Sequence, residues 1–335
     1  MDKAPHFIVA RDQRLGSGDT RILSRRYAKG ELVRVRRGVY LDKQYWISLT
    51  PWQRYARTVE AVALELPGAD FCYETAALAW GLKLVGVPSH VHLAGTSASH
   101  AGVGNATTTA AMQRRSGTTG LEGIRGYGIF RHCYPVSPVR RRGLSITPLL
   151  QTAVDVMARS TFTKSVILAD HVVNPLHFKG TSTEKEDLRS AAQSLRAVSR
   201  RRWVARAIDF ADAQSGSPGE SLSRAQMHLL GFPKPELQVE FRDHDGFVAR
   251  TDFFWRDLRI VGEFDGDAKY LRDEYLAGLS AREVVLAEKK REDRLRALGL
   301  MVVRWDWPIA SDPAKLTRKL VQAGLPLDPA KKIPG

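Results

Sequence analysis

Two spacings of apolar residues occur in the last third of the chain. Ser217 is a typical helix cap, Pro218 suits the first helical position, and Glu220 follows three residues after the cap. Apolar residues then recur at helical spacing until Gly231, where a glycine commonly ends a helix. The pattern therefore predicts a helix that begins directly after Ser217.

Alternating apolar and polar residues follow this helix and predict strands. Three segments have this pattern: 235–241, 247–255 and 258–266. A polar turn containing Asp245 and Gly246 joins the first two segments, as in a hairpin. A further helix over 281–298 and a strand over 301–307 give the order helix, three strands, helix, strand.

The first half of the chain begins with a similar but shorter pattern. Ile22, Leu23 and Tyr27 recur at helical spacing before Gly30, and the stretch LVRVRRGVY then alternates and turns at RRG. This predicts a short helix followed by a β-ribbon. The expected middle elements are helices over 51–66, 74–80, 144–160 and 183–214, a strand between 81 and 96, a strand over 127–136 and a loop over 97–120. The fold class is thus multidomain, mixed α+β and α/β.

Composition is that of an ordinary soluble protein, with 335 residues, 43% hydrophobic and 26% charged. No run of about 18 apolar residues is present, and the N-terminus lacks the apolar core of a secretory signal. We therefore expect a cytoplasmic protein without a membrane partner. Cys72 and Cys133 lie in apolar or aromatic surroundings in the sequence, and we expect both thiols to be buried.

The net charge of +15 is unevenly distributed, because residues 1–215 carry +14 and residues 216–335 carry +1. A large positive excess favours polyanions, and double-stranded DNA is the expected partner. The alternative is a basic surface that only keeps the protein soluble. The chain is divided into three expected domains: 1–48, 49–215 and 216–335.

Seven basic residues lie close together between positions 21 and 40. A helix can enter the major groove of DNA, and a basic ribbon beside it can hold phosphates or enter the minor groove. The alternative is a solvated basic hairpin without a ligand. The candidate DNA-binding residues are Arg21, Arg25, Arg26 and Lys29 on the helix, and Arg34, Arg36 and Arg37 on the ribbon.

The phrase GELVRVRRGVYL resembles the end of the winged helix-turn-helix in AbiEi-type antitoxins and related actinobacterial transcriptional regulators. The resemblance implies that 1–48 is a winged DNA-binding domain with its first helix near Phe7 to Arg14, and that 49–215 is an AbiEi-like middle domain. It also implies a transcriptional regulator and antitoxin with a nucleotidyltransferase-like toxin as partner. We expect such a regulator to be a homodimer on a palindromic site.

Acidic residues are concentrated where the third predicted strand ends. Glu263 and Asp265 are two residues apart and share one face of the strand, whereas Phe264 faces the other side. Two carboxylates about 4 Å apart repel by roughly 4 kcal/mol at an effective dielectric constant near 20, so a compensating cation is needed. Asp252 on the neighbouring strand completes a predicted site for Mg²⁺ or Mn²⁺. Alternatively, Glu220 only caps its helix and Asp265 is an exposed strand end.

Four phrases in order resemble the very-short-patch-repair (Vsr-like) branch of the PD-(D/E)XK nuclease fold. They are PGES, Thr251-Asp252-Phe253, and residues 263–269 and 289–305. The resemblance implies a metal-dependent endonuclease site formed by Asp252, Glu263, Asp265 and Glu220, with a cation from Lys269, Lys289 or Lys290. Asp265 occupies the position where this fold usually has a lysine.

Two functions therefore remain open from the sequence. The first is a DNA-binding regulator and antitoxin that carries a nuclease-fold domain. The second is a magnesium-dependent DNA endonuclease that uses its basic N-terminal part to find its substrate.

Overall fold

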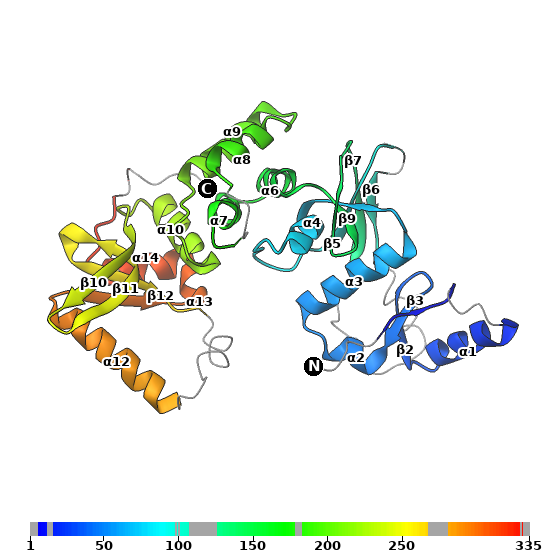
Figure 1. The fold of residues 1–335 in the computed structure, drawn as a ribbon, viewed down its shortest axis with the longest axis horizontal. Coiled ribbons are helices and arrows are strands. Elements are labelled where there is room, and N and C mark those ends of the chain that lie inside the picture. The colour runs from blue at the N-terminus through cyan, green and yellow to red at the C-terminus, as the bar shows by residue number, and fades with distance from the viewer. Residues whose placement is uncertain are drawn as a thin grey trace. The chain divides into compact units, whose positions relative to one another are not determined.

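The computed structural model describes residues 6–11, 16–97, 99, 101–106, 126–177, 183–266, 281–328 and 330. The chain forms two compact units, residues 1–156 and residues 157–335. Three sheets and the helices around them make up a mixed α/β protein of more than one unit, in agreement with the expected class (Figure 1). Within the described ranges, every helix is too short or too polar to cross a bilayer.

Unit 1 begins with a small sheet and two helices. Helix α1 (Gly16–Ala28) precedes strands β2 (Leu32–Arg36) and β3 (Val39–Asp42), which confirms the expected helix and ribbon, and α2 (Lys43–Ser48) follows. The expected first helix near Phe7 to Arg14 is not observed over residues 6–11. Ile8 and Val9 form strand β1 there and pair antiparallel with β3, because β-branched side chains fit a strand. Residues 12–15 lie outside the described ranges.

The β2–β3 ribbon is stabilised by the apolar residues that alternate along its strands. Val33, Val35, Val39 and Leu41 are buried and pack with Trp46 of α2 in one apolar cluster. The ribbon turns at Gly38, whose φ of 72° is readily adopted by glycine. The charged residues of β2 therefore alternate with core residues on a short, firmly packed hairpin.

The rest of unit 1 is built around a six-stranded sheet in the order β6-β7-β5-β4-β9-β8. Strand β6 lies inside the segment that was expected to be a loop. Cys72 is buried as expected, but Cys133 is exposed because the last residue of β7 faces away from the buried His132. The elements are α3 (Pro51–Glu65), β4 (Asp70–Phe71), α4 (Tyr73–Trp80), β5 (His90–Gly95), β6 (Gly102–Gly104), β7 (Gly128–Cys133), β8 (Val139–Arg141), β9 (Leu144–Ile146) and α6 (Leu149–Met157).

Unit 2 opens with four helices. They are α7 (Phe162–Val173), α8 (Lys185–Ala192), α9 (Val198–Phe210) and α10 (Pro218–Leu230). The single polar helix expected over 183–214 is thus two helices, and Ser194 lies in the break, where its hydroxyl donates to the carbonyl of Ala191 at 2.7 Å. Helix α10 packs against α7, so unit 2 continues across residue 215. The three-domain division stays a prediction.

A four-stranded sheet follows in the order β10-β11-β12-β13. Its strands are β10 (Glu236–Asp243), β11 (Gly246–Trp255), β12 (Ile260–Phe264) and β13 (Met301–Trp305). The first three strands are antiparallel and the last pair is parallel, with α12 (Ala281–Ala297) in the connection. The predicted order of helix, three strands, helix and strand is therefore observed. Two further helices, α13 (Trp307–Ala310) and α14 (Pro313–Gln322), follow β13.

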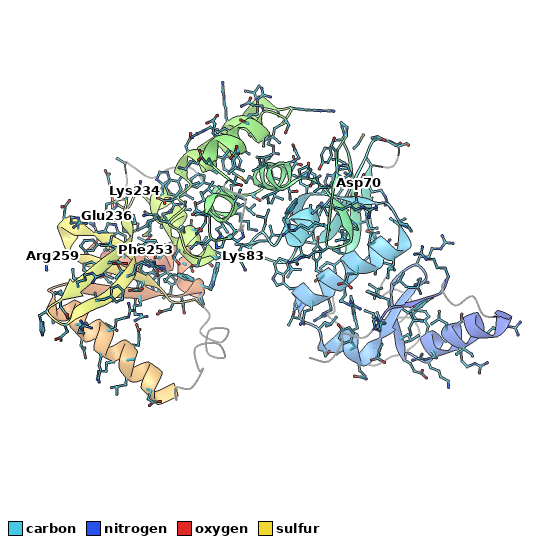
Figure 2. All side chains as sticks on the ribbon, viewed as in Figure 1. Asp70, Lys83, Lys234, Glu236, Phe253 and Arg259 are labelled. Carbon is cyan, nitrogen blue, oxygen red and sulfur yellow. The ribbon has the colours of Figure 1, made fainter. Side chains whose placement is uncertain are left out.

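The two faces of this sheet are covered by different helices, α12 on one side and α10 with α14 on the other (Figure 1). On the α10 side, Phe253, labelled in Figure 2, is fully buried and stacks on Trp305 with ring centroids 5.4 Å apart. The indole N–H of Trp305 donates to the hydroxyl of Ser223 in α10 at 2.8 Å. On the α12 side, Val261 and Leu295 share an apolar cluster. Residues 252 and 263 belong to the α12 side by alternation.

Candidate functional site

Four polar side chains from four different elements meet at one end of the sheet in unit 2. Glu220 comes from α10, Gln238 from β10, Asp252 from β11 and Glu263 from β12. Phe253 pairs with Gly262 across β11 and β12, so the next pair in the same register brings Asp252 opposite Glu263. The sheet register therefore places the two acids side by side.

A very close contact between α10 and β12 fixes the position of Glu220. A Cβ built on Gly219 would lie 1.9 Å from Cε1 of Phe264, so only glycine allows the first turn of α10 to approach this strand. The hydroxyl of Ser217 caps the helix by accepting the backbone N–H of Glu220 at 3.2 Å. The Glu220 carboxylate accepts the backbone N–H of Gly216 at 2.9 Å. Glu220 thus belongs to the helix cap and also faces the acids.

Gln238 adopts a left-handed backbone conformation within β10, with a φ of 53°. The register of β10 against β11 is the same on both sides of this residue, since Leu237 pairs with Phe253 and Val239 with Thr251, so Gln238 stands opposite Asp252. The side-chain amide of Gln238 donates to Glu220 Oε2 at 3.0 Å. A strained residue in a strand often marks a functional position, and this residue was not predicted from the sequence.

Asp252 is oriented by the neighbouring strand. Its Oδ2 accepts the backbone N–H of Phe264 at 2.8 Å. Burial raises the pKa of the Asp252 carboxyl, although hydrogen bonds from Phe264 and Gln238 and the charge of Arg291 act in the opposite direction. The carboxylate is therefore held in one orientation in a poorly solvated position.

Two further carboxyls of the site have strongly shifted pKa values. Burial, and then the negative charge of Asp252, raise the pKa of Glu220 to about 7 and that of Glu263 to about 7. Only 9% of Glu220 and 7% of Glu263 are exposed. Acids that repel one another in a buried position are a site where a divalent cation would be favoured, since such a cation prefers hard carboxylate oxygens. The donor chemistry of Asp252 and Glu263 fits Mg²⁺ or Mn²⁺.

Asp265 lies at the rim of this group and is bound by another residue. It follows β12 on the same side as Glu263, and its carboxylate accepts Arg304 Nη2 at 2.8 Å. About half of the Asp265 side chain is exposed. The ligand atoms of Asp252, Glu263 and Asp265 do not all lie within 4.8 Å of one another, so these three side chains do not form one metal-binding group in this conformation.

A different triplet meets that geometric condition among the described residues. Ligand atoms of Asp243, His244 and Asp245 lie within 4.8 Å of one another, in the turn between β10 and β11. Arg294 already holds Asp243 through two hydrogen bonds of 2.5 and 2.7 Å, and this ion pair lowers the pKa of Asp243 to about 2. An acidic turn with its own arginine is an ordinary surface feature, and we do not interpret it as a site.

The cation in contact with the acids is Arg291, which was not predicted. Its Nη1 donates to Glu263 Oε1 at 3.2 Å, and its Nη2 donates to Glu288 Oε1 at 2.7 Å. The predicted Lys289 is exposed on the same helix, and the predicted Lys269 lies outside the described residues. The helical period explains the difference, because positions 288, 291 and 295 share the face of α12 that is turned toward the sheet.

The basic residues of unit 1 divide into exposed and engaged groups. Exposed side chains are Arg21 and Arg25 of α1, Lys29 directly after it, and Arg37 of the ribbon turn. Arg26 pairs with Glu31 at 3.0 Å, and Arg34 lies over the ring of Tyr27 at 5.6 Å.

Arg36 was expected to contact DNA, but it is directed inward. It is 7% exposed, and its Nε donates to Glu65 Oε2 of α3 at 2.6 Å. Because this guanidinium is occupied inside the unit, Arg36 is left out of the exposed basic group.

No protein-family model matches the chain. Two uncharacterized proteins of Mycobacterium tuberculosis, MT2308 and Rv2248, are each 36% identical to it over 108 residues. The match covers 32% of this chain and 35% of each relative, so the chain spans about a third of the length of the curated proteins that it matches. The crystal structure of the RV2827C protein from M. tuberculosis aligns with a TM-score of 0.35 and 14% identity, over 71% of this chain and 84% of that one.

Proposed function

We propose that the chain acts on double-stranded DNA and that its second unit carries a metal-dependent endonuclease site of the PD-(D/E)XK type. The observation that carries this proposal is the group of buried carboxyls formed by Glu220, Asp252 and Glu263, with the strained Gln238 beside them. Burying three acids that repel one another costs stability, so these acids do not serve the fold. A bound divalent cation would compensate their charge.

Each residue of the group has a role in phosphodiester hydrolysis under this proposal. Asp252 and Glu263 would hold Mg²⁺ or Mn²⁺, which supplies an activated water and stabilises charge on the phosphate. Glu220 would take up the proton of the attacking water, because its carboxylate faces the other two acids from the first turn of α10. Gln238 orients Glu220 through its amide.

The proposed reaction is the hydrolysis of one phosphodiester bond. The water oxygen bonds to phosphorus, and one bond from phosphorus to a deoxyribose oxygen breaks. The products are a phosphate monoester and a hydroxyl, which takes up the proton that the water releases.

The test is incubation of the full chain with supercoiled plasmid and Mg²⁺ or Mn²⁺. We expect nicking by the wild type, and a rate at least about 100-fold lower in Asp252→Asn and Glu263→Gln. Glu236→Gln is the matched control, because Glu236 is an exposed acid of the same sheet that pairs with Arg256. Absence of nicking with both metals, or nicking that persists in both variants, contradicts the endonuclease.

A second candidate is a DNA-binding regulator and antitoxin with a nucleotidyltransferase-like toxin as partner. It is favoured by α1, the turn after it and the β2–β3 ribbon, which present Arg21, Arg25, Lys29 and Arg37 to solvent. Helix and ribbon arrangements of this kind can bind the major groove and the flanking phosphates. Tight, sequence-selective binding to the promoter of its own gene without any nicking would favour this candidate.

A further inference from the structure

The acidic group in unit 2 contacts a cation that belongs to the protein itself. Arg291 donates to Glu263, and Arg304 donates to Asp265 and Glu288. The two arginines differ in position. Arg304 is tied to the rim residue Asp265, whereas Arg291 touches the carboxylate that lies opposite Asp252.

We propose that Arg291 has two alternative partners: Glu263 when no metal is bound, and the phosphate of the substrate when a divalent cation occupies Asp252 and Glu263. The inference rests on the proposed endonuclease function. Asp265, two positions after Glu263, is an acid and cannot supply a positive charge. The inference assigns this role to Arg291.

The geometry supports an exchange of partners. Arg291 and a divalent cation compete for Glu263, because both are positive and both use its carboxylate oxygens. When the cation binds, Arg291 loses one of its two carboxylate partners but keeps Glu288, which lies one turn earlier on α12. Its side chain is 24% exposed, so the guanidinium can turn toward solvent without unpacking the helix.

The chemistry of arginine limits this role. A guanidinium stays protonated at any working pH, so Arg291 cannot take a proton from water. It can donate two parallel hydrogen bonds to a phosphate, and this geometry suits charge that develops on non-bridging oxygens. Arg291 is therefore assigned to phosphate stabilisation, and the proton is left to a carboxylate.

The experiment compares Arg291→Gln and Arg291→Lys with Arg296→Gln in the full chain. Arg296 is the matched control, because it is an arginine of the same helix that pairs with Glu292 and is 58% exposed. Mn²⁺ affinity is measured by titration calorimetry without DNA. Binding of a short duplex is measured with Ca²⁺ present and absent, and nicking is measured with Mn²⁺.

We expect Arg291→Gln to bind Mn²⁺ roughly tenfold more tightly than the wild type, because the competing charge is gone. We expect the same variant to lose the Ca²⁺-dependent gain in duplex affinity and to nick about 100-fold more slowly. Arg291→Lys should retain the wild-type Mn²⁺ affinity but nick slowly, since it keeps the charge and loses the paired donors.

The outcomes separate this inference from the proposed function. Mn²⁺ affinity that is unchanged or weaker in a folded Arg291→Gln overturns the inference, whatever the wild type does to DNA. Wild-type nicking that persists in Arg291→Gln overturns the inference and leaves the endonuclease standing. If the wild type binds Mn²⁺ but does not nick DNA, the proposed endonuclease function is wrong. In that case the two partners of Arg291 are still supported if Arg291→Gln binds Mn²⁺ more tightly and loses the Ca²⁺-dependent gain in duplex affinity.

Discussion

Arg36 of the ribbon and Glu65 of α3 form an ion pair of 2.6 Å in the interior of unit 1. Their side chains are 9% and 17% exposed, so removal of one partner leaves the other charge poorly solvated. We expect Arg36→Ala to lower the free energy of unfolding by about 3–5 kcal/mol, measured by urea denaturation.

Arg37 is the natural control for this substitution, because it is the next residue and is exposed. Arg37→Ala should change stability by less than about 0.5 kcal/mol. Equal stability of the two variants would contradict a structural role for Arg36. Because Arg36→Ala is expected to destabilise unit 1, loss of DNA binding in this variant would not be evidence that Arg36 contacts DNA directly.

The exposed basic residues of α1 and of the turn after it give a prediction about salt dependence. If Arg21, Arg25 and Lys29 each contact one phosphate, each change to Gln should reduce the slope of log K against log salt by about 1. The measurement is duplex affinity by fluorescence anisotropy over a range of salt concentrations. Lys315→Gln in unit 2 serves as the control. A wild-type affinity that does not depend on salt would exclude this surface as a DNA site.

The buried glutamates predict how stability depends on pH. Their pKa values are about 7 in the folded protein and ordinarily 4.5, so the folded state binds more protons than the unfolded state between these values. Stability without metal should fall as pH rises from about 4.5 to 7 and level off above. Glu263→Gln removes one of the two groups and should be more stable than the wild type at pH 8, by on the order of 3 kcal/mol.

Urea denaturation at pH 5 and pH 8 checks this expectation. The advantage of Glu263→Gln should be much smaller at pH 5, where the wild-type carboxyl is already mostly protonated in the folded state. An equal difference at both pH values would show that the substitution acts through packing. Added Mg²⁺ should stabilise the wild type at pH 8 and not the variant, since the ionised carboxyl is the ligand.

The contact between Gly219 and Phe264 predicts a large effect from a single methyl group. Gly219→Ala places a carbon where the ring of Phe264 lies and should cost about 1–3 kcal/mol or more, because helix and strand must separate. Gly266→Ala is the matched control, since no atom lies within 4 Å of the position of its Cβ. Wild-type thermal stability in Gly219→Ala would show that the helix shifts freely.

The elements of unit 2 were predictable because helix caps, alternation and turn residues agree along 217–266. The sharing of one strand face by Glu263 and Asp265 followed from the same alternation. Gln238 was missed because a backbone that leaves the strand conformation at one residue has no signature in apolar spacing. Arg291 was missed because the rotation of α12 about its axis depends on packing against the sheet.

The inward direction of Arg36 could not be predicted from the sequence either. The three arginines of the ribbon were expected to contact DNA from the surface, but a register shift between Arg34 and Arg36 changes the side to which the later residue points. The partner, Glu65, lies 29 positions away on another helix. A pairing of this kind is invisible to local sequence patterns.

The left-handed conformation of Gln238 also has an evolutionary consequence. Such a backbone costs on the order of 1–3 kcal/mol, and the Gln238 amide that it positions hydrogen-bonds two carboxylates, Glu220 and Asp252. Descendants that lose both acids lose the reason to keep this strain, so drift should replace Gln238 with an ordinary β-branched strand residue. The residue found at this position in a lineage would then indicate whether selection still maintains the site.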